Sequence, residues 1–268
     1  MSGRATCAAL ACALLAALAG APRAGATPPP PIVKPSGENR MSPLQLGAQL
    51  FAGNCVSCHG IGGSGVLALT DGRGANEIAR AGPPLIGVGA LAADFYTRTG
   101  YMPLGDPDDQ PIRSRVQFSR RERQALVQYV ASLGGGPPVP RPDVAAGDVA
   151  EGRELFTEHC SGCHQVVAAG GVMPGAKAPP LNDATPVEVA EAVRIGPYVM
   201  PKFTKKDISD AQLNSIVAYV QYAKNPDDAG GWGLDHLGPF PEGMVTWLIA
   251  AVVLVLTCML IGKRMSQT

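Results

Sequence analysis

The sequence predicts an all-α protein, with two small tandem domains of related sequence followed by one membrane-spanning helix. Three observations lead to this class. Two segments of the chain repeat each other, the periodic stretches in both repeats have helical spacing, and a long uncharged apolar run lies near the C-terminus. Neither repeat holds an alternating strand pattern of useful length, so the sequence gives no reason to expect a sheet.

The two repeats are residues 41–133, here called domain 1, and residues 149–226, here called domain 2. Six positions recur at identical spacing: Gly47, Leu50, Phe51, Cys55, Cys58 and His59 match Gly152, Leu155, Phe156, Cys160, Cys163 and His164. Each copy continues with a Pro-Pro-Leu and a Met-Pro: Pro83-Pro84-Leu85 and Met102-Pro103 in domain 1, Pro179-Pro180-Leu181 and Met200-Pro201 in domain 2. We therefore expect one fold used twice, joined by a proline-stiffened linker over residues 134–148.

Each repeat is predicted to begin and end with a helix. Ser42 followed by Pro43 is a typical helix start, because Ser caps free N–H groups and Pro fits the first helical position. The closing helices are predicted over Ser119–Leu133 and Ser209–Ala223. Both begin with capping boxes: Ser119 with Glu122, and Ser209 with Gln212.

Composition limits the classes of partner. The chain carries 22 basic and 22 acidic side chains, so it has no net field to gather nucleic acid or to coat an anionic membrane. We expect no nucleic-acid partner. With 33 Gly, 25 Pro and few aromatic residues, the domains should be small and rich in loops. Domains of this size usually need a disulfide, metal or cofactor to be stable.

The two ends of the chain are apolar in different ways. A basic start at Arg4, a short apolar run over Cys7–Leu18 and an Ala-Gly-Ala ending predict a signal peptide over residues 1–26, cleaved after Ala26. The alternative is an uncleaved anchor. A proline-rich tether follows over residues 27–40.

The C-terminal run, residues 244–262, has nineteen residues without a charge, enough for a helix of about 30 Å that crosses a bilayer. A Gly-rich juxtamembrane linker, residues 227–243, leads into it. Lys263 and Arg264 follow it, so the positive-inside rule places the tail, residues 263–268, in the cytoplasm. We expect a single-pass protein of the cell membrane with both domains on the extracytoplasmic face.

Four of the seven cysteines form two CxxC pairs, each followed directly by His, while Cys7, Cys12 and Cys258 lie in the apolar ends. In an exported chain, C-x-x-C-H is typical of c-type haem attachment, in which the thiols form thioethers and the His ligates iron. A structural zinc site would need a fourth ligand, and a thioredoxin-like redox pair would need a βαβ context. The pattern therefore predicts two covalently bound haem c groups, on Cys55 and Cys58 and on Cys160 and Cys163.

Both repeats resemble class I cytochromes c. In that family the first helix carries a Gly and an aromatic residue four positions later, where it crosses the last helix; Gly47/Phe51 and Gly152/Phe156 match, with Tyr129 and Tyr219 as partners. The resemblance implies His59 and His164 as axial iron ligands, with the carbonyl groups of Pro83 and Pro179 holding their rings. It implies Met102 and Met200 as the sixth ligands.

Other candidates are given simpler roles. Met173 lies only nine residues after His164, and His159 is expected to be a solvated helix residue. The run Arg120–Arg123 is expected to be the solvated face of a helix, and His236 an ordinary residue of the juxtamembrane linker. Met/His coordination leaves no open iron position, so the chain is expected to relay electrons and not to be an enzyme on its own.

The order of signal peptide, two class I domains and C-terminal anchor narrows the resemblance. The chain resembles the dihaem cytochrome c subunit of the actinobacterial menaquinol:cytochrome c reductase, or cytochrome bcc complex. Besides the domain order, four segments carry this resemblance: Pro84–Gly89, Gly230–Leu234, Leu237–Pro239 and Glu242-Gly243. That resemblance implies three partners: a cytochrome b subunit, a Rieske iron–sulfur protein and a terminal cytochrome c oxidase. The loop Leu104–Gln117 is longer than its counterpart after Met200.

Two alternatives remain open at this point. The chain could be the dihaem subunit of an oxidase or a dehydrogenase, although many such oxidase subunits carry an N-terminal anchor. It could also be a dihaem peroxidase, which would need a vacant or bis-His iron.

Overall fold

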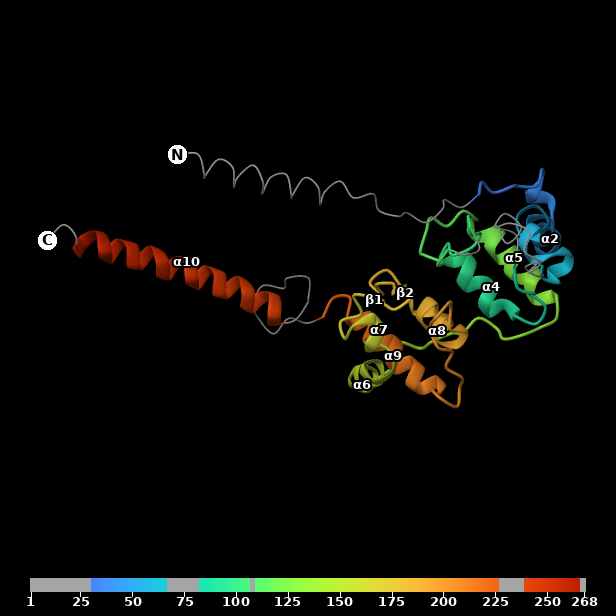
Figure 1. The fold of residues 1–268 in the computed structure, drawn as a ribbon. Helices are drawn as coiled ribbons and strands as arrows, with labels where there is room; N and C mark the ends of the chain where they lie inside the picture. Colours follow the sequence, from blue (N-terminus) through green and yellow to red (C-terminus); the bar gives the residue numbers. More distant parts are fainter. Residues whose placement is uncertain (1–29, 67–81, 107–108, 227–238, 266–268) are drawn as a thin grey trace, which may run out of the picture.

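The computed structural model describes residues 30–66, 82–106, 109–226 and 239–265 (Figure 1). It is mainly helical, which confirms the predicted all-α class. The predicted signal peptide, the residues of the juxtamembrane linker before Pro239, with His236, and the cytoplasmic end after Met265 lie outside the described residues.

Domain 1 is built on a crossing of its first and last helices. Its elements are η1 (Glu38–Arg40, before the repeat itself), α2 (Pro43–Asn54), α3 (Val56–His59), η2 (Ile61–Gly63), α4 (Gly89–Arg98) and α5 (Arg120–Ser132). Helix α5 packs against both α2 and α4 (Figure 1). The core between them is formed by Leu46, Leu50, Phe51, Phe118, Ala125, Leu126 and Val130.

Domain 2 repeats this arrangement. Its elements are α6 (Val149–His159), α7 (Ser161–His164), β1 (Gly171–Met173), β2 (Ala176–Ala178), α8 (Pro186–Ile195) and α9 (Asp210–Tyr222). Helix α9 packs against α6 and α8, and the small antiparallel hairpin pairs Val172 with Lys177. Helix α8 also packs against α4 of domain 1, so the two domains touch through their equivalent helices.

The close approach of the first and last helices in each domain depends on glycine. A Cβ added to Gly47 would collide with the Ala125 carbonyl group and with the Tyr129 side chain. A Cβ on Gly152 would collide with the Ser215 carbonyl group in the same way. Aromatic rings pack beside each crossing: the centroids of Phe51 and Tyr129 are 5.1 Å apart, and those of Phe156 and Tyr219 are 5.3 Å apart. The predicted helix crossings are therefore confirmed.

The predicted helix starts are also confirmed. Ser42, Ser119 and Ser209 each accept a hydrogen bond from the backbone N–H three residues later, and the residue there bonds back. Such a cap contributes about 1 kcal/mol. Thr185 and Glu188 form a further capping box at α8, which the sequence analysis did not single out.

Three features differ from expectation. The sequence analysis did not predict α4 and α8, and it did not predict the hairpin, whose three-residue strands are too short to show alternation. The Arg120–Arg123 run is not wholly a solvated face. Glu122 is buried, with 2% of its side chain exposed, and it forms an ion pair of 2.8 Å with Lys34.

The last described helix, α10 (Pro239–Met265), contains the predicted span. Its segment Gly243–Met265 contains an 18-residue window with a mean hydropathy of 2.7, and the segment is long and apolar enough to cross a membrane. The large apolar side chains along this segment are exposed, including Trp247 and Leu254. An exposed apolar helix of this length fits a lipid environment better than water.

Candidate haem-binding sites

Each CxxCH motif forms a single helical turn directly after the first helix of its domain. Helix α2 ends at Asn54, and the His59 N–H donates to the Cys55 carbonyl oxygen over 2.8 Å. In domain 2, the His164 N–H donates to the Cys160 carbonyl oxygen over 2.9 Å. Residues three apart share one face of such a turn, so both thiols of a pair lie on the same side, beside the imidazole.

The thiols are half-buried and not bonded to each other: Cys55, Cys58, Cys160 and Cys163 are all free. Burial raises the pKa of Cys55 and of Cys160 to about 12, and the neighbouring thiol of each pair adds to the effect. A redox-active CxxC pair needs a thiolate with a lowered pKa. The structure therefore argues against the thioredoxin-like alternative.

Both histidine rings are held from behind by a proline carbonyl group. The Nδ1 atom of His59 lies 2.8 Å from the Pro83 oxygen, and that of His164 lies 3.0 Å from the Pro179 oxygen. A ring that donates Nδ1–H to a carbonyl group keeps the lone pair of Nε2 free for a metal. Burial lowers the pKa of His164, and the Pro179 hydrogen bond acts in the opposite direction. The predicted contact between the histidine ring and a proline carbonyl group is present in both domains.

A largely apolar cavity lies beside the CxxCH turn of domain 2. Cys160, Cys163 and His164 contribute to its wall, together with Met173 and Met200. The structure thus brings both candidate methionines of domain 2 to the same cavity. His159 also lines it, with its ring centroid 5.8 Å from that of Phe203, so this residue is not purely a solvated helix residue.

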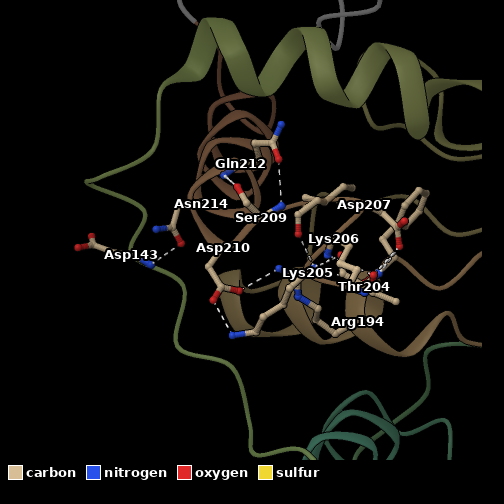
Figure 2. A network of polar contacts seen from close by, with 12 residues as sticks. Asp143, Arg194, Thr204, Lys205, Lys206, Asp207, Ser209, Asp210, Gln212 and Asn214 are labelled. Atoms are coloured by element: carbon tan, nitrogen blue, oxygen red, sulfur yellow. Dashed lines mark hydrogen bonds and ion pairs between the residues drawn. The ribbon is translucent and has the colours of Figure 1, made fainter.

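The segment that follows Met200 is held by a polar network that includes Arg194, Thr204 and Asp210 (Figure 2). Arg194, near the end of α8, donates from Nη1 to three carbonyl oxygens, those of Phe203, Thr204 and Ile208, over 3.3, 3.0 and 2.7 Å. Its Nη2 pairs with Asp210 at 2.9 Å. These contacts fix the segment that follows Met200 against α8 and the start of α9.

Sequence reasoning missed Arg194, although a signal for it exists. An Arg-Xaa-Gly precedes the Met-Pro of each repeat, at Arg98-Thr99-Gly100 and at Arg194-Ile195-Gly196. In domain 1, Met102 lies four residues after Arg98, the last residue of α4, and its N–H donates to the Tyr96 carbonyl oxygen over 3.0 Å.

The residues present fit a covalently attached haem. Each motif offers two thiols and one oriented imidazole on a single turn, and in domain 2 these face an apolar cavity with a thioether donor in its wall. Among residues 30–66, 82–106, 109–226 and 239–265, no group of three or more His, Cys, Asp or Glu side chains is positioned to hold a free metal ion.

Comparison with known proteins agrees with this chemistry. Residues 44–134 match the family described as Cytochrome c, and residues 147–220 match the family described as Cytochrome C oxidase, cbb3-type, subunit III. The cytochrome bc1 complex cytochrome c subunit of Corynebacterium diphtheriae is 34% identical over 239 residues, which cover 82% of this chain and 81% of that protein. The subunit of the same name from Mycobacterium tuberculosis is 35% identical over 245 residues, or 88% and 83%.

A more distant relative belongs to a terminal oxidase. The cbb3-type cytochrome c oxidase subunit CcoP of an Azospirillum species is 29% identical over 195 residues, which cover 65% of this chain and 60% of that protein. Coverage and identity are both lower than for the bc1 subunits. The chain is therefore a dihaem cytochrome c with two covalently bound haem c groups, and it belongs to the family of cytochrome bc1 complex cytochrome c subunits.

Proposed function

We propose that this chain relays electrons within a quinol:cytochrome c reductase of the bcc type, from a Rieske iron–sulfur protein to a terminal oxidase. The observation that carries the proposal is the pair of complete CxxCH turns, each with its proline-held histidine, on a chain whose described part includes one helix apolar and long enough to cross a membrane. Haem supplies the one-electron chemistry, because its iron cycles between the ferrous and ferric states. The protein supplies attachment, orientation and shelter from water.

In this proposal each residue has a definite role. Cys55, Cys58, Cys160 and Cys163 hold the two haems by thioethers. His59 and His164 are the proximal iron ligands, and the carbonyl groups behind their rings support this assignment. Met102 and Met200 are the sixth ligands. Met200 is supported by the Arg194 network, which anchors the segment after it, and by its match to Met102 in the repeat.

The proposal also covers the partners of the chain and its location in the cell. Relatives named as subunits of the cytochrome bc1 complex support assembly with a cytochrome b subunit and a Rieske protein. Helix α10 supports a single-pass anchor in the cell membrane, and Lys263 and Arg264 at its end support haem domains on the extracytoplasmic face. The boundaries given above, residues 41–133 and 149–226 for the domains and 244–262 for the span, belong to this proposal.

A second candidate, the dihaem subunit of an oxidase, has one observation in its favour. Domain 2 matches a family of cbb3-type oxidase subunits, and CcoP is a relative. The bc1 subunits of C. diphtheriae and M. tuberculosis are the better match because they align with 82% and 88% of the chain, against 65% for CcoP.

Purification of the full chain from its native membrane in a mild detergent tests the proposal. We expect a cytochrome b spectrum and the Rieske electron paramagnetic resonance signal to co-purify with the chain. Recovery with an oxidase or a dehydrogenase, without cytochrome b and the Rieske protein, would contradict the assignment. Peroxide turnover by the purified chain would instead support a peroxidase.

A further inference from the structure

We propose that residues 109–117 of domain 1 form a clamp that holds domain 1 over the haem cavity of domain 2. This segment is the described end of the loop Leu104–Gln117, which is longer than its counterpart in domain 2. The inference rests on the proposed haem function of domain 2, and it assigns a role to the extra length. The clamp would set one arrangement of the two haem domains and shield the cavity from solvent.

The first contact is between Gln110 and the outer edge of β2. The Gln110 side chain donates from Nε2 to the Lys177 carbonyl oxygen over 2.6 Å, and its Oε1 accepts from the Lys177 N–H over 2.9 Å. One amide side chain therefore satisfies both backbone groups of Lys177. Because two hydrogen bonds join the same amide to the same residue, they fix both the position and the orientation of the Gln110 side chain on β2. A single hydrogen bond would fix its position only.

The second contact is an ion pair. Arg113 Nη2 lies 2.9 Å from Oε2 of Glu188, whose side chain is only 5% exposed. The same carboxylate oxygen accepts the Thr185 N–H at the start of α8 over 2.8 Å. Glu188 thus joins the clamp to the helix start of domain 2, and its burial makes this pair stronger than an exposed one.

The third contact is between α4 and α8. Asp94 and Glu191 are both buried at this surface, with 7% and 0% exposure. Arg98 pairs with Asp94 through Nε at 2.9 Å. Burial acts to lower the pKa of Arg98, but the Asp94 pair, and after it Glu191 and Glu188 of domain 2, raise this pKa overall. Titratable groups of both domains therefore share one buried surface. Two independent domains would leave these groups in water.

These contacts make domain 1 part of the wall of the haem cavity of domain 2. Six of its residues line that cavity: Phe95, Thr99, Tyr101, Gln110, Pro111 and Arg113. Tyr101 directly precedes Met102, the proposed iron ligand of domain 1. The two haem sites are thus linked through adjacent residues of one chain, and the clamp keeps this short connection in place without any domain movement.

The test uses the full chain in detergent and the double substitution Gln110→Ala with Arg113→Ala. We expect faster hydrogen–deuterium exchange in peptides containing residues 176–178, because the Lys177 N–H loses its acceptor. We also expect a shift of the domain 2 haem to lower reduction potential, because solvent exposure stabilises the ferric state. Unchanged exchange would overturn the clamp, and a faster exchange with an unchanged potential would overturn its shielding role.

Two further variants make the test specific. Glu188→Gln keeps an acceptor for the Thr185 N–H but removes the charge that Arg113 pairs with, so it should also speed hydrogen–deuterium exchange in peptides containing residues 176–178. Arg115→Ala removes an equal charge from an exposed position in the same segment, and it should change neither readout. A pyridine haemochrome of the unaltered chain separates the two proposals, because fewer than two haems per chain would contradict the haem function and not the clamp.

Discussion

The two haem domains share one motif order but hold the segment after the methionine in different ways. In domain 2 this segment is short and is fastened to its own domain by Arg194, which bonds three carbonyl oxygens and Asp210. In domain 1 it is longer, and its contacts reach Lys177 and Glu188 of the other domain. The segment of domain 2 is therefore fastened within its own domain. The segment of domain 1 has bonds from Ser114 to Thr99 and Gly100 of its own domain and is bound to the neighbouring domain as well.

Arg98 and Arg194 are equivalent residues of the two domains, yet they make different contacts. Arg98 and Arg194 occupy the same place, at the end of the second long helix and two residues before a glycine. Arg98 pairs with Asp94 and faces the other domain, whereas Arg194 binds backbone carbonyl groups of its own domain. The function of a repeated residue therefore follows from the surface against which its helix packs, and not from the repeat itself.

The largest expected effect comes from removing one attachment site. Replacing Cys160 and Cys163 with Ala should eliminate the domain 2 haem, while domain 1 keeps its own through Cys55 and Cys58. A pyridine haemochrome should fall from two haems per chain to one. The matched replacement of Cys55 and Cys58 should give the same value. Loss of both haems in either variant would mean that the domains do not mature independently.

The second expected effect separates the two methionines of the domain 2 cavity. Met200→Ala should retain the covalent haem but remove half of the near-infrared methionine-to-iron band and lower the potential of that haem, because a thioether ligand favours ferrous iron. Met173→Ala is the matched control and should leave the band intact. The reverse result would assign the ligand to Met173.

The third prediction concerns the fastening within domain 2. Arg194→Ala removes the side-chain donor of the Phe203 and Ile208 carbonyl oxygens, while the Thr204 oxygen still accepts from the Asp207 and Ile208 N–H groups, and it breaks the Asp210 ion pair. It should therefore destabilise domain 2 by roughly 2–4 kcal/mol. Thermal unfolding followed through the domain 2 haem spectrum measures this change. Arg98→Ala is the control in the equivalent position and should lower the stability of domain 1 by less, because Arg98 bonds a single side chain there. An equal loss of stability in the two variants would mean that Arg98 and Arg194 stabilise their domains to the same extent.

The smallest effect is a change in pH dependence. Burial, followed by the nearby Asp94 carboxylate, raises the pKa of Glu191 from 4.5 to about 9, while the Arg98 charge opposes the shift. The folded state then binds more protons than the unfolded state, so this group lowers stability as pH rises from about 4.5 to about 9.

Glu191→Gln should remove that slope. Its melting temperature should equal that of the unaltered chain near pH 5 and exceed it near pH 9. Glu154→Gln, at an exposed position on α6, should leave the slope unchanged. A Glu191→Gln variant with the original slope would mean that another group titrates.

Much of this architecture could be predicted from the sequence because it depends on local patterns. The capping residues Ser42, Ser119 and Ser209 and the CxxCH turns act within four positions of the chain, and the repeat supplied an internal check on each. The helix crossing at Gly47 was predictable from the family resemblance. The contacts that hold the domains together were not, because Gln110 and Arg113 act across 67 and 75 residues and carry no spacing signal.

The amide of Gln110 also changes what β2 can offer to other molecules. A two-stranded hairpin has exposed outer edges, whose free N–H and C=O groups can pair with a strand from another chain. At Lys177 the Gln110 side chain bonds both of these groups, in the way that one residue of a neighbouring strand would. The same contact that positions one domain on the other therefore protects this edge from intermolecular β-pairing, and so from aggregation while the chain awaits its partners.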